Sequence, residues 1–132
     1  MNLLHRRIVF SVLCLSVCVS LVGCGDKKVG FTVKGKVVQG GQTLVPNDKV
    51  KLRVTLNELK PDGVTLGEGS IPTVINDDGT FEADVPAGKY RVQVEYGTYP
   101  GDDFKGKYSQ TGSPIVEEIT GATEDLVIEV SM

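Results

Sequence analysis

Tyr90-Arg91-Val92-Gln93-Val94-Glu95-Tyr96 decides the fold of this chain, because apolar and polar side chains alternate along it without a break. Successive side chains of a β-strand point to opposite faces of its sheet. The alternation therefore predicts a strand with one face in a core and the other in water. The same pattern occurs in Val50-Lys51-Leu52-Arg53-Val54-Thr55-Leu56. We expect these two stretches to form long, half-buried strands.

Shorter apolar stretches of the same kind lie before, between and after these two strands. They cover Phe31–Val37, Thr73–Ile75, Thr80–Val85, Ile115–Thr120 and Leu126–Val130. Turn residues separate them at Gly40-Gly41, Lys60-Pro61-Asp62-Gly63, Asn76-Asp77-Asp78-Gly79 and Pro86-Ala87-Gly88. Gly35, inside the first stretch, predicts a bulge or a close approach of another backbone. About seven short strands without a helical pattern predict an all-β fold, a seven-stranded antiparallel β-sandwich.

A second informative stretch is the apolar run Ile8–Val22, which follows two arginines. At about 15 residues it is shorter than the ~20 that a spanning helix needs. It ends in Leu21-Val22-Gly23-Cys24, the order of residues at a lipoprotein cleavage site. We therefore predict a signal peptide over residues 1–23, cleaved between Gly23 and Cys24, with acyl chains such as palmitate on Cys24. A retained transmembrane anchor, the alternative, would not need a small residue followed by Cys.

This processing divides the chain into three parts. Residues 1–23 are the signal peptide, residues 24–30 are the lipidated Cys and a short tether, and residues 31–132 are the β-sandwich domain. Six extended residues span about 20 Å at most, so we expect the domain close to the headgroups. The predicted location is the non-cytoplasmic side of a bacterial envelope membrane. Gly25, where an Asp would favour the inner membrane, favours the outer one.

The composition after residue 23 excludes several classes of protein. The 109 residues that remain suit one domain. Their 12 basic and 17 acidic residues give a net charge of −5, which argues against binding to nucleic acid or to anionic lipid. His5, Cys14 and Cys18 leave with the signal peptide. Disulfides, Ser/His or Cys/His nucleophiles and thiolate or imidazole metal sites are therefore excluded.

Asp77, Asp78 and Glu82 are oxygen ligands that Ca²⁺ could use. Ca²⁺ needs six to eight oxygens, however, and this stretch offers only two adjacent carboxylates. We expect a hairpin turn instead, in which Gly79 has a positive φ and an Asp accepts bonds from its own backbone. We predict no metal ion and no cofactor.

Four further acidic residues could form a catalytic pair, namely Asp102, Asp103, Glu117 and Glu118. Glycoside hydrolysis needs two carboxyl groups about 5–10 Å apart. Adjacent acids are more typical of a solvated face, so we predict no catalytic residue and no enzyme activity.

The irregular segment Gly97–Pro114 contains the aromatic residues Tyr99, Phe104 and Tyr108. Loops on a rigid sandwich carry recognition, and tyrosine is favoured at interfaces. Tyr99, Phe104 and Tyr108 are therefore the candidate partner-binding residues. The alternative, strongest for Tyr96 and Tyr108, is that these rings hold the segment against the sandwich.

Three motifs in order resemble the carboxypeptidase regulatory-like domain, which has a transthyretin-like (prealbumin-like) seven-stranded sandwich. They are Val33-Lys34-Gly35-Lys36-Val37, Asn76-Asp77-Asp78-Gly79-Thr80-Phe81 and Val85-Pro86-Ala87-Gly88-Lys89-Tyr90-Arg91-Val92. The tail from Lys107-Tyr108-Ser109 onward is similar to the end of small bacterial lipoproteins built on this module. The resemblance covers Phe31 to Met132.

The resemblance implies a binding or structural accessory module rather than a catalyst. The predicted function is a membrane-anchored envelope lipoprotein with a non-catalytic module for protein–protein interaction. A small-ligand binder, for carbohydrate or calcium, is the alternative, and a hydrolase is the third. The Gly-rich stretch between Leu56 and Thr73 departs from the family pattern and leaves the strand order there open.

Overall fold

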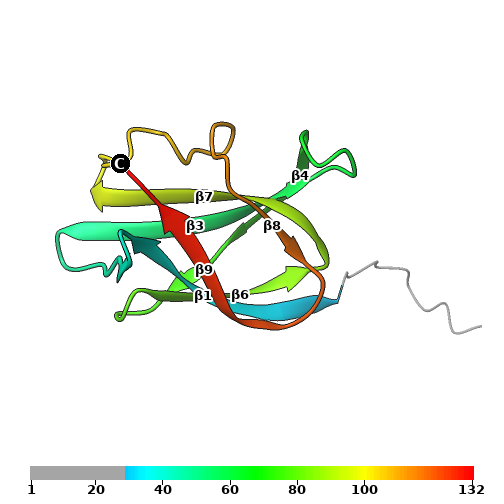
Figure 1. The fold of residues 1–132 in the computed structure, drawn as a ribbon, viewed down its shortest axis with the longest axis horizontal. Helices are drawn as coiled ribbons and strands as arrows, with labels where there is room; N and C mark the ends of the chain where they lie inside the picture. The colour runs from blue at the N-terminus through cyan, green and yellow to red at the C-terminus, as the bar shows by residue number, and fades with distance from the viewer. Residues whose placement is uncertain (1–28) are drawn as a thin grey trace, which may run out of the picture.

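The computed structural model describes residues 29–132, which form nine strands and no helix (Figure 1). The strands are β1 (Gly30–Gln39), β2 (Gln42–Thr43), β3 (Val50–Leu59), β4 (Leu66–Pro72), β5 (Val74–Ile75), β6 (Thr80–Pro86), β7 (Gly88–Thr98), β8 (Val116–Ile119) and β9 (Thr123–Val130). No helix in this part of the chain has the length and apolarity to cross a bilayer. The predicted signal peptide, Gly23 and Cys24 lie outside the described residues.

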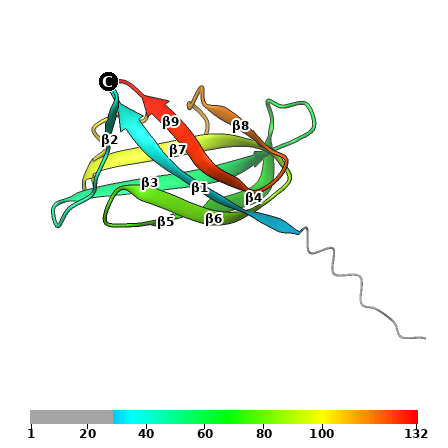
Figure 2. The same cartoon turned by 60° about the horizontal axis from the view of Figure 1, so that its bottom comes forward.

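The strands form two sheets that pack face to face, which confirms the predicted all-β sandwich (Figures 1 and 2). Sheet A contains β9, β1, β6 and β5, with β2 paired to the end of β1, and sheet B has the order β4-β3-β7-β8. All pairs are antiparallel except β1 and β9, which run parallel, so the predicted antiparallel pairing is wrong for this one pair, and the nine strands exceed the seven predicted. The parallel pair arises because β8 in sheet B ends beside Gly88, and a short turn then brings β9 into sheet A from the end where β1 begins.

The core lies between the sheets and uses the alternation seen in the sequence. Tyr90, Val92 and Val94 point inward from β7, and each is at most 1% exposed. The residues that complete the buried cluster from the other strands are Val33, Val37, Leu52, Val54, Leu56, Phe81, Val85, Ile119, Ile128 and Val130. Burying one such side chain stabilises the fold by about 1.5–3 kcal/mol. The apolar residues of the pattern that predicts the strands are thus also the main source of stability.

The chain passes directly from one sheet to the other between β4 and β5. The chain leaves β4 in sheet B and enters β5 in sheet A at Thr73. The Thr73 amide and hydroxyl both donate to the Val54 carbonyl oxygen, at 3.0 and 2.9 Å. β4 occupies the Gly-rich stretch whose strand order the sequence left open.

Gly35 confirms the predicted irregularity in the first strand. The register between β1 and β9 shifts between Val33 and Gly35. A Cβ at Gly35 would overlap the carbonyl oxygen of Leu126 and the ring of Phe81. The close approach of β9 therefore requires glycine at this position.

The segment between β7 and β8, residues 99–115, runs along the free edge of β7. The Asp103 amide donates to the Tyr96 carbonyl oxygen at 2.7 Å. Farther along, the Val94 amide donates to the carbonyl oxygen of Tyr108 at 3.0 Å, and the Val92 amide donates to the carbonyl oxygen of Ile115 at 2.9 Å. This crossover thus hydrogen-bonds to the backbone of β7 along the part of its edge that β8 does not reach.

Candidate functional site

Phe104 and Tyr108 lie in the core, with 5% and 4% of their surface exposed. Their rings meet edge to face with centroids 5.1 Å apart, and Phe104 also lies 6.5 Å from the ring of Tyr96. The crossover thus adds both rings to the buried core cluster. This corrects two of the three residues predicted for partner binding, since buried rings cannot contact a partner.

Tyr99 is the third predicted residue, and its side chain is 69% exposed. It is the one exposed aromatic residue in the part of the chain that the structure describes. The Arg53 guanidinium carbon lies 5.3 Å from the centre of its ring, a cation–π geometry. Tyr99 follows the end of β7, and its peptide bond to Pro100 is cis.

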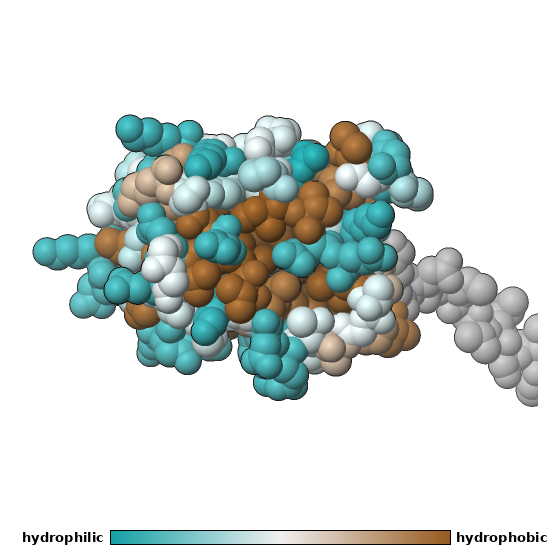
Figure 3. All heavy atoms as spheres, viewed as in Figure 1, coloured by the Kyte–Doolittle hydropathy of each residue, from teal (hydrophilic) through white to brown (hydrophobic). Residues whose placement is uncertain are grey.

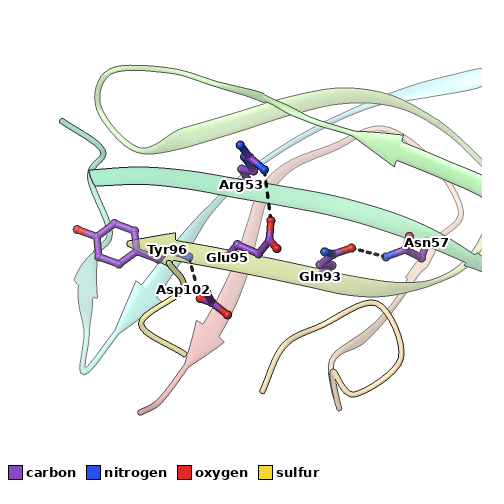
Figure 4. A network of polar contacts seen from close by, with 6 residues as sticks. All are labelled: Arg53, Asn57, Gln93, Glu95, Tyr96 and Asp102. Carbon is purple, nitrogen blue, oxygen red and sulfur yellow. Dashed lines mark hydrogen bonds and ion pairs between the residues drawn. The ribbon is translucent and has the colours of Figure 1, made fainter. Parts of the chain in front are cut away.

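Asp102 holds the turn that carries Tyr99. Its Oδ1 accepts the amides of Tyr96 and Phe104 at 3.3 and 3.1 Å, and its Oδ2 accepts the amide of Gly106 at 2.9 Å. The bond between Asp102 and the Tyr96 amide is drawn in Figure 4. A carboxylate that accepts three backbone amides organises a loop, so Asp102 fixes where the exposed ring lies.

The acidic residues considered for catalysis are far apart. Asp103 is bonded to Tyr96 near one end of β7, whereas Glu117 lies opposite Tyr90 near the other end. Six residues of strand separate the two places by about 20 Å, too far for a carboxyl pair. Glu117 is half-buried, which raises the pKa of its carboxyl, and Glu118 is exposed.

The Asn76–Gly79 stretch is a tight turn. Oδ1 of Asp78 accepts the Thr80 amide at 2.9 Å and also the Thr80 hydroxyl. These bonds, the hydroxyl bond foremost, lower the pKa of Asp78. Gly79 has a φ of 85°. Among residues 29–132 no group of three or more potential ligand side chains is arranged to hold a metal ion.

The outer face of sheet B carries a row of polar side chains from β3 and β7 (Figure 4). At one end of the row the crossover folds over Asn57, which is 1% exposed. Its Oδ1 accepts a hydrogen bond from the Ser70 hydroxyl at 2.7 Å and another from the side-chain amide nitrogen of Gln110 at 3.3 Å. Arg91, beside it, donates to the carbonyl oxygens of Val64 and Thr111, at 3.2 and 3.3 Å. This half of the face is covered, which the alternating pattern did not predict.

The other half of the same face is open and lies beside Tyr99. Arg53 and Glu95 face each other in register, with their charged groups 3.9 Å apart, and both side chains are exposed. A small hollow of about 50 Å³ lies there, and Lys51, Arg53, Glu95, Tyr99 and Asp102 are among its lining residues. We call this surface the Tyr99 face.

Sheet A carries a larger depression of about 530 Å³ on its outer side. Its lining includes Lys34, which lies opposite Glu82 in register, and Glu124 and Asp125 of β9. Opposite charges on neighbouring strands stabilise a sheet. The depression has no exposed aromatic ring, and we therefore place the candidate site at the Tyr99 face.

The view in Figure 3 shows apolar residues gathered over β9 and between β9 and β7. Val116 and Val127 are 45% and 48% exposed, and Leu126 and Ile115 are partly buried beside the core. β9 pairs only with β1 among the described strands, so it is an edge strand. Exposed charges on such a strand, here Glu124, Asp125 and Glu129, disfavour pairing with another chain.

No protein-family model and no curated protein matches this chain. Two solved structures of DUF3823 family proteins are similar to it. The protein from Bacteroides ovatus ATCC 8483 is 20% identical with a TM-score of 0.47, over 76% of this chain and 43% of that chain. The protein from Parabacteroides merdae ATCC 43184 is 21% identical with a TM-score of 0.49, over 76% of this chain and 45% of that chain. The chain therefore spans less than half the length of either structure.

Proposed function

We propose that this protein is a lipid-anchored lipoprotein of the bacterial envelope whose β-sandwich is a non-catalytic binding module. The cleavage-site sequence that ends in Cys24 supports the anchor, and the turn and strand motifs support a module of the carboxypeptidase regulatory-like type. The Tyr99 face binds another component of the envelope.

The exposed ring of Tyr99 is the observation that carries this proposal. Tyrosine and arginine dominate the residues that supply binding energy at interfaces, and here Arg53 lies against the ring. The ring projects from a turn that Asp102 holds and that lies at the end of a long strand. A site on such a rigid support loses little conformational entropy on binding.

The position of the ring within the sandwich also supports the proposal. Gly30 pairs with Pro86 at the end where β7 begins, whereas Thr98 pairs with Val50 at the other end. In Figure 1 the start of β1 and the end of β7 lie at opposite ends of the molecule. An anchor at Cys24 would therefore leave Tyr99 on the side away from the membrane, about 35 Å along β7.

The test is binding of the purified full-length lipoprotein, in detergent, to an insoluble envelope fraction of its own cells, measured by co-sedimentation. We expect saturable binding that falls at least tenfold for Tyr99→Ala. Lys36→Gln, which removes an exposed charge from the other sheet, should bind as the wild type does. Equal binding of all three proteins, or no binding by the wild type, would overturn the proposal.

A further inference from the structure

The hollow of the Tyr99 face is lined by an exposed aromatic ring, two cations and two carboxylates. Lys51 and Arg53 line the hollow from β3, and Glu95 and Asp102 line it from β7 and the turn that follows. An anionic group placed there meets two carboxylates, and a cationic group meets two cations. Net charge at the hollow therefore favours neither, and an uncharged ligand fits it better than an acidic or basic peptide.

The arrangement of donors and acceptors suits hydroxyl groups. A hydroxyl both donates and accepts, whereas a guanidinium only donates and a carboxylate only accepts. Arg53 and Glu95 present the two kinds of group side by side, 3.9 Å apart. Lys51, which forms no ion pair with any residue of 29–132, adds a further donor.

The shape of the face suits a ring that lies flat. About 10–15 Å³ is enough for one water molecule, so a hollow of about 50 Å³ admits a hydroxymethyl group or a pair of hydroxyls but not a whole sugar ring. The sugar ring itself would lie beside the hollow with its C–H face on the side of Tyr99 that Arg53 does not cover, since an aromatic side chain offers an apolar face beside polar groups. Thr55 and Gln93, opposite each other in register, extend the hydrogen-bonding row along the strands.

On these grounds we infer that the Tyr99 face binds a neutral polysaccharide of the envelope, with a sugar ring on Tyr99 and its hydroxyls between Arg53 and Glu95. The inference rests on the proposed function and names the chemistry of its ligand. A protein partner would need an apolar, desolvated centre at its interface. The Tyr99 face lacks such a centre, because Tyr99 is the one large exposed ring that the described residues place on it.

The experiment divides the envelope fraction into three portions: untreated, digested with protease, and oxidised with periodate, which cleaves the vicinal diols of sugars. Full-length lipoprotein is added to each in detergent. We expect co-sedimentation to survive the protease and to fall at least tenfold after periodate. Binding should also change less than twofold between 0.05 and 0.5 M NaCl, because salt screens charge–charge attraction and leaves hydroxyl contacts largely intact.

Variants locate the contact. Glu95→Gln keeps an acceptor but loses its charge, and we expect about fivefold weaker binding, since hydrogen bonds to charged groups are the stronger ones. Lys36→Gln again serves as the control. Binding that is lost after protease and kept after periodate would overturn the polysaccharide assignment while leaving the proposed function intact. Strong salt dependence would overturn it in favour of a charged ligand. A wild type that fails to bind the untreated fraction would instead count against the proposed function.

Discussion

The hydroxyl of Tyr108 donates to the carbonyl oxygen of Ser131 at 3.1 Å and accepts the Ser131 amide at 2.8 Å. Twenty-two residues lie between them in sequence, yet the two bonds join the crossover to the chain just after β9. Lys107 adds a bond from its Nζ to the same carbonyl oxygen at 2.9 Å. The predicted partner-binding loop is thus bonded to the opposite sheet, and Tyr99 is the one of its three aromatic residues that stays exposed to contact a ligand.

Tyr108→Phe tests these bonds. The change keeps the buried ring but removes the hydroxyl and leaves the Ser131 amide without its partner. We expect the free energy of unfolding to fall by about 1–2 kcal/mol, the cost of losing such bonds at a buried site. Tyr99→Phe removes the same hydroxyl from an exposed ring and should change it by less than about 0.5 kcal/mol. Urea unfolding of both variants measures the difference, and equal losses would contradict the role of Tyr108.

Phe104→Ala distinguishes packing from recognition within the same segment. Phe104 is buried against Tyr108, so its loss should cost about 3–5 kcal/mol of stability. Domains of this size are stable by about 5–15 kcal/mol, and a large fall in melting temperature is therefore expected. Tyr99→Ala should leave the melting temperature almost unchanged while lowering binding to the envelope fraction at least tenfold. If Phe104→Ala melts at the same temperature as the wild type, the placement of this ring in the core is wrong.

The longer strands could be predicted from the sequence, because strict alternation of apolar and polar residues admits one secondary structure and one buried face. β2 and β4 could not, because the first has only two residues and the second is interrupted by Gly67 and Gly69. Tyr90 and Leu56 are in the core for this reason. The burial of Phe104 could not be predicted, because an irregular segment has no period that marks an inward face. Asn57 shows the same limit, since the outer face of a strand is solvated only where no other part of the chain covers it.

The candidate site was predicted only in part. Tyr99 stands out in the sequence as an aromatic residue in a Gly- and Asp-rich loop. Arg53 and Glu95 do not stand out, because each is one polar position in an alternating strand. Their proximity depends on the register of β3 against β7, which a single strand's pattern does not encode.

Asp62 makes stability depend on pH. The hydroxyl of Thr65 first, and then the amides of Val64 and Thr65, donate to its carboxylate and lower its pKa to about 2. The unfolded value is about 3.9. A depressed pKa in the folded state contributes stability that is present above pH 4 and lost as pH falls toward 2.

Asp62→Asn should therefore be less stable than the wild type at pH 7, and the two melting temperatures should converge between pH 4 and pH 2. Thermal unfolding followed by circular dichroism at several pH values measures this. Asp125→Asn, a change at an exposed acid on β9, is the control. A constant difference between Asp62→Asn and the wild type across this range would show that the carboxylate charge is not what the turn uses.

Gly35→Ala tests the contact between β1 and β9. The added Cβ would overlap the Leu126 carbonyl oxygen, which belongs to the backbone and cannot turn away as a side chain can. We expect a loss of at least about 2–3 kcal/mol, since overpacking a dense interior forces the backbone to shift. Gly121→Ala, where a Cβ would meet nothing, should be tolerated. Chemical unfolding of the two variants provides the comparison, and equal stability would mean that β9 can move away from β1.

Cys24→Ala tests the anchor, which the sequence predicts and which lies outside the described residues. Burying acyl chains contributes about 0.8 kcal/mol per CH₂, so one chain binds a membrane marginally and two or more hold it stably. The net charge of −5 after residue 23 gives no electrostatic attraction to replace them. We therefore expect the variant to leave the membrane fraction or to remain uncleaved, and to incorporate no alkyne-labelled palmitate, whereas Cys18→Ala should be labelled like the wild type.

The anchor also determines which way the Tyr99 face points, because the sandwich begins within a few residues of Cys24. Unchanged labelling and unchanged mass in Cys24→Ala would remove the lipoprotein assignment together with the orientation derived from it, and the binding chemistry of the Tyr99 face would then have to be tested on the protein free in solution.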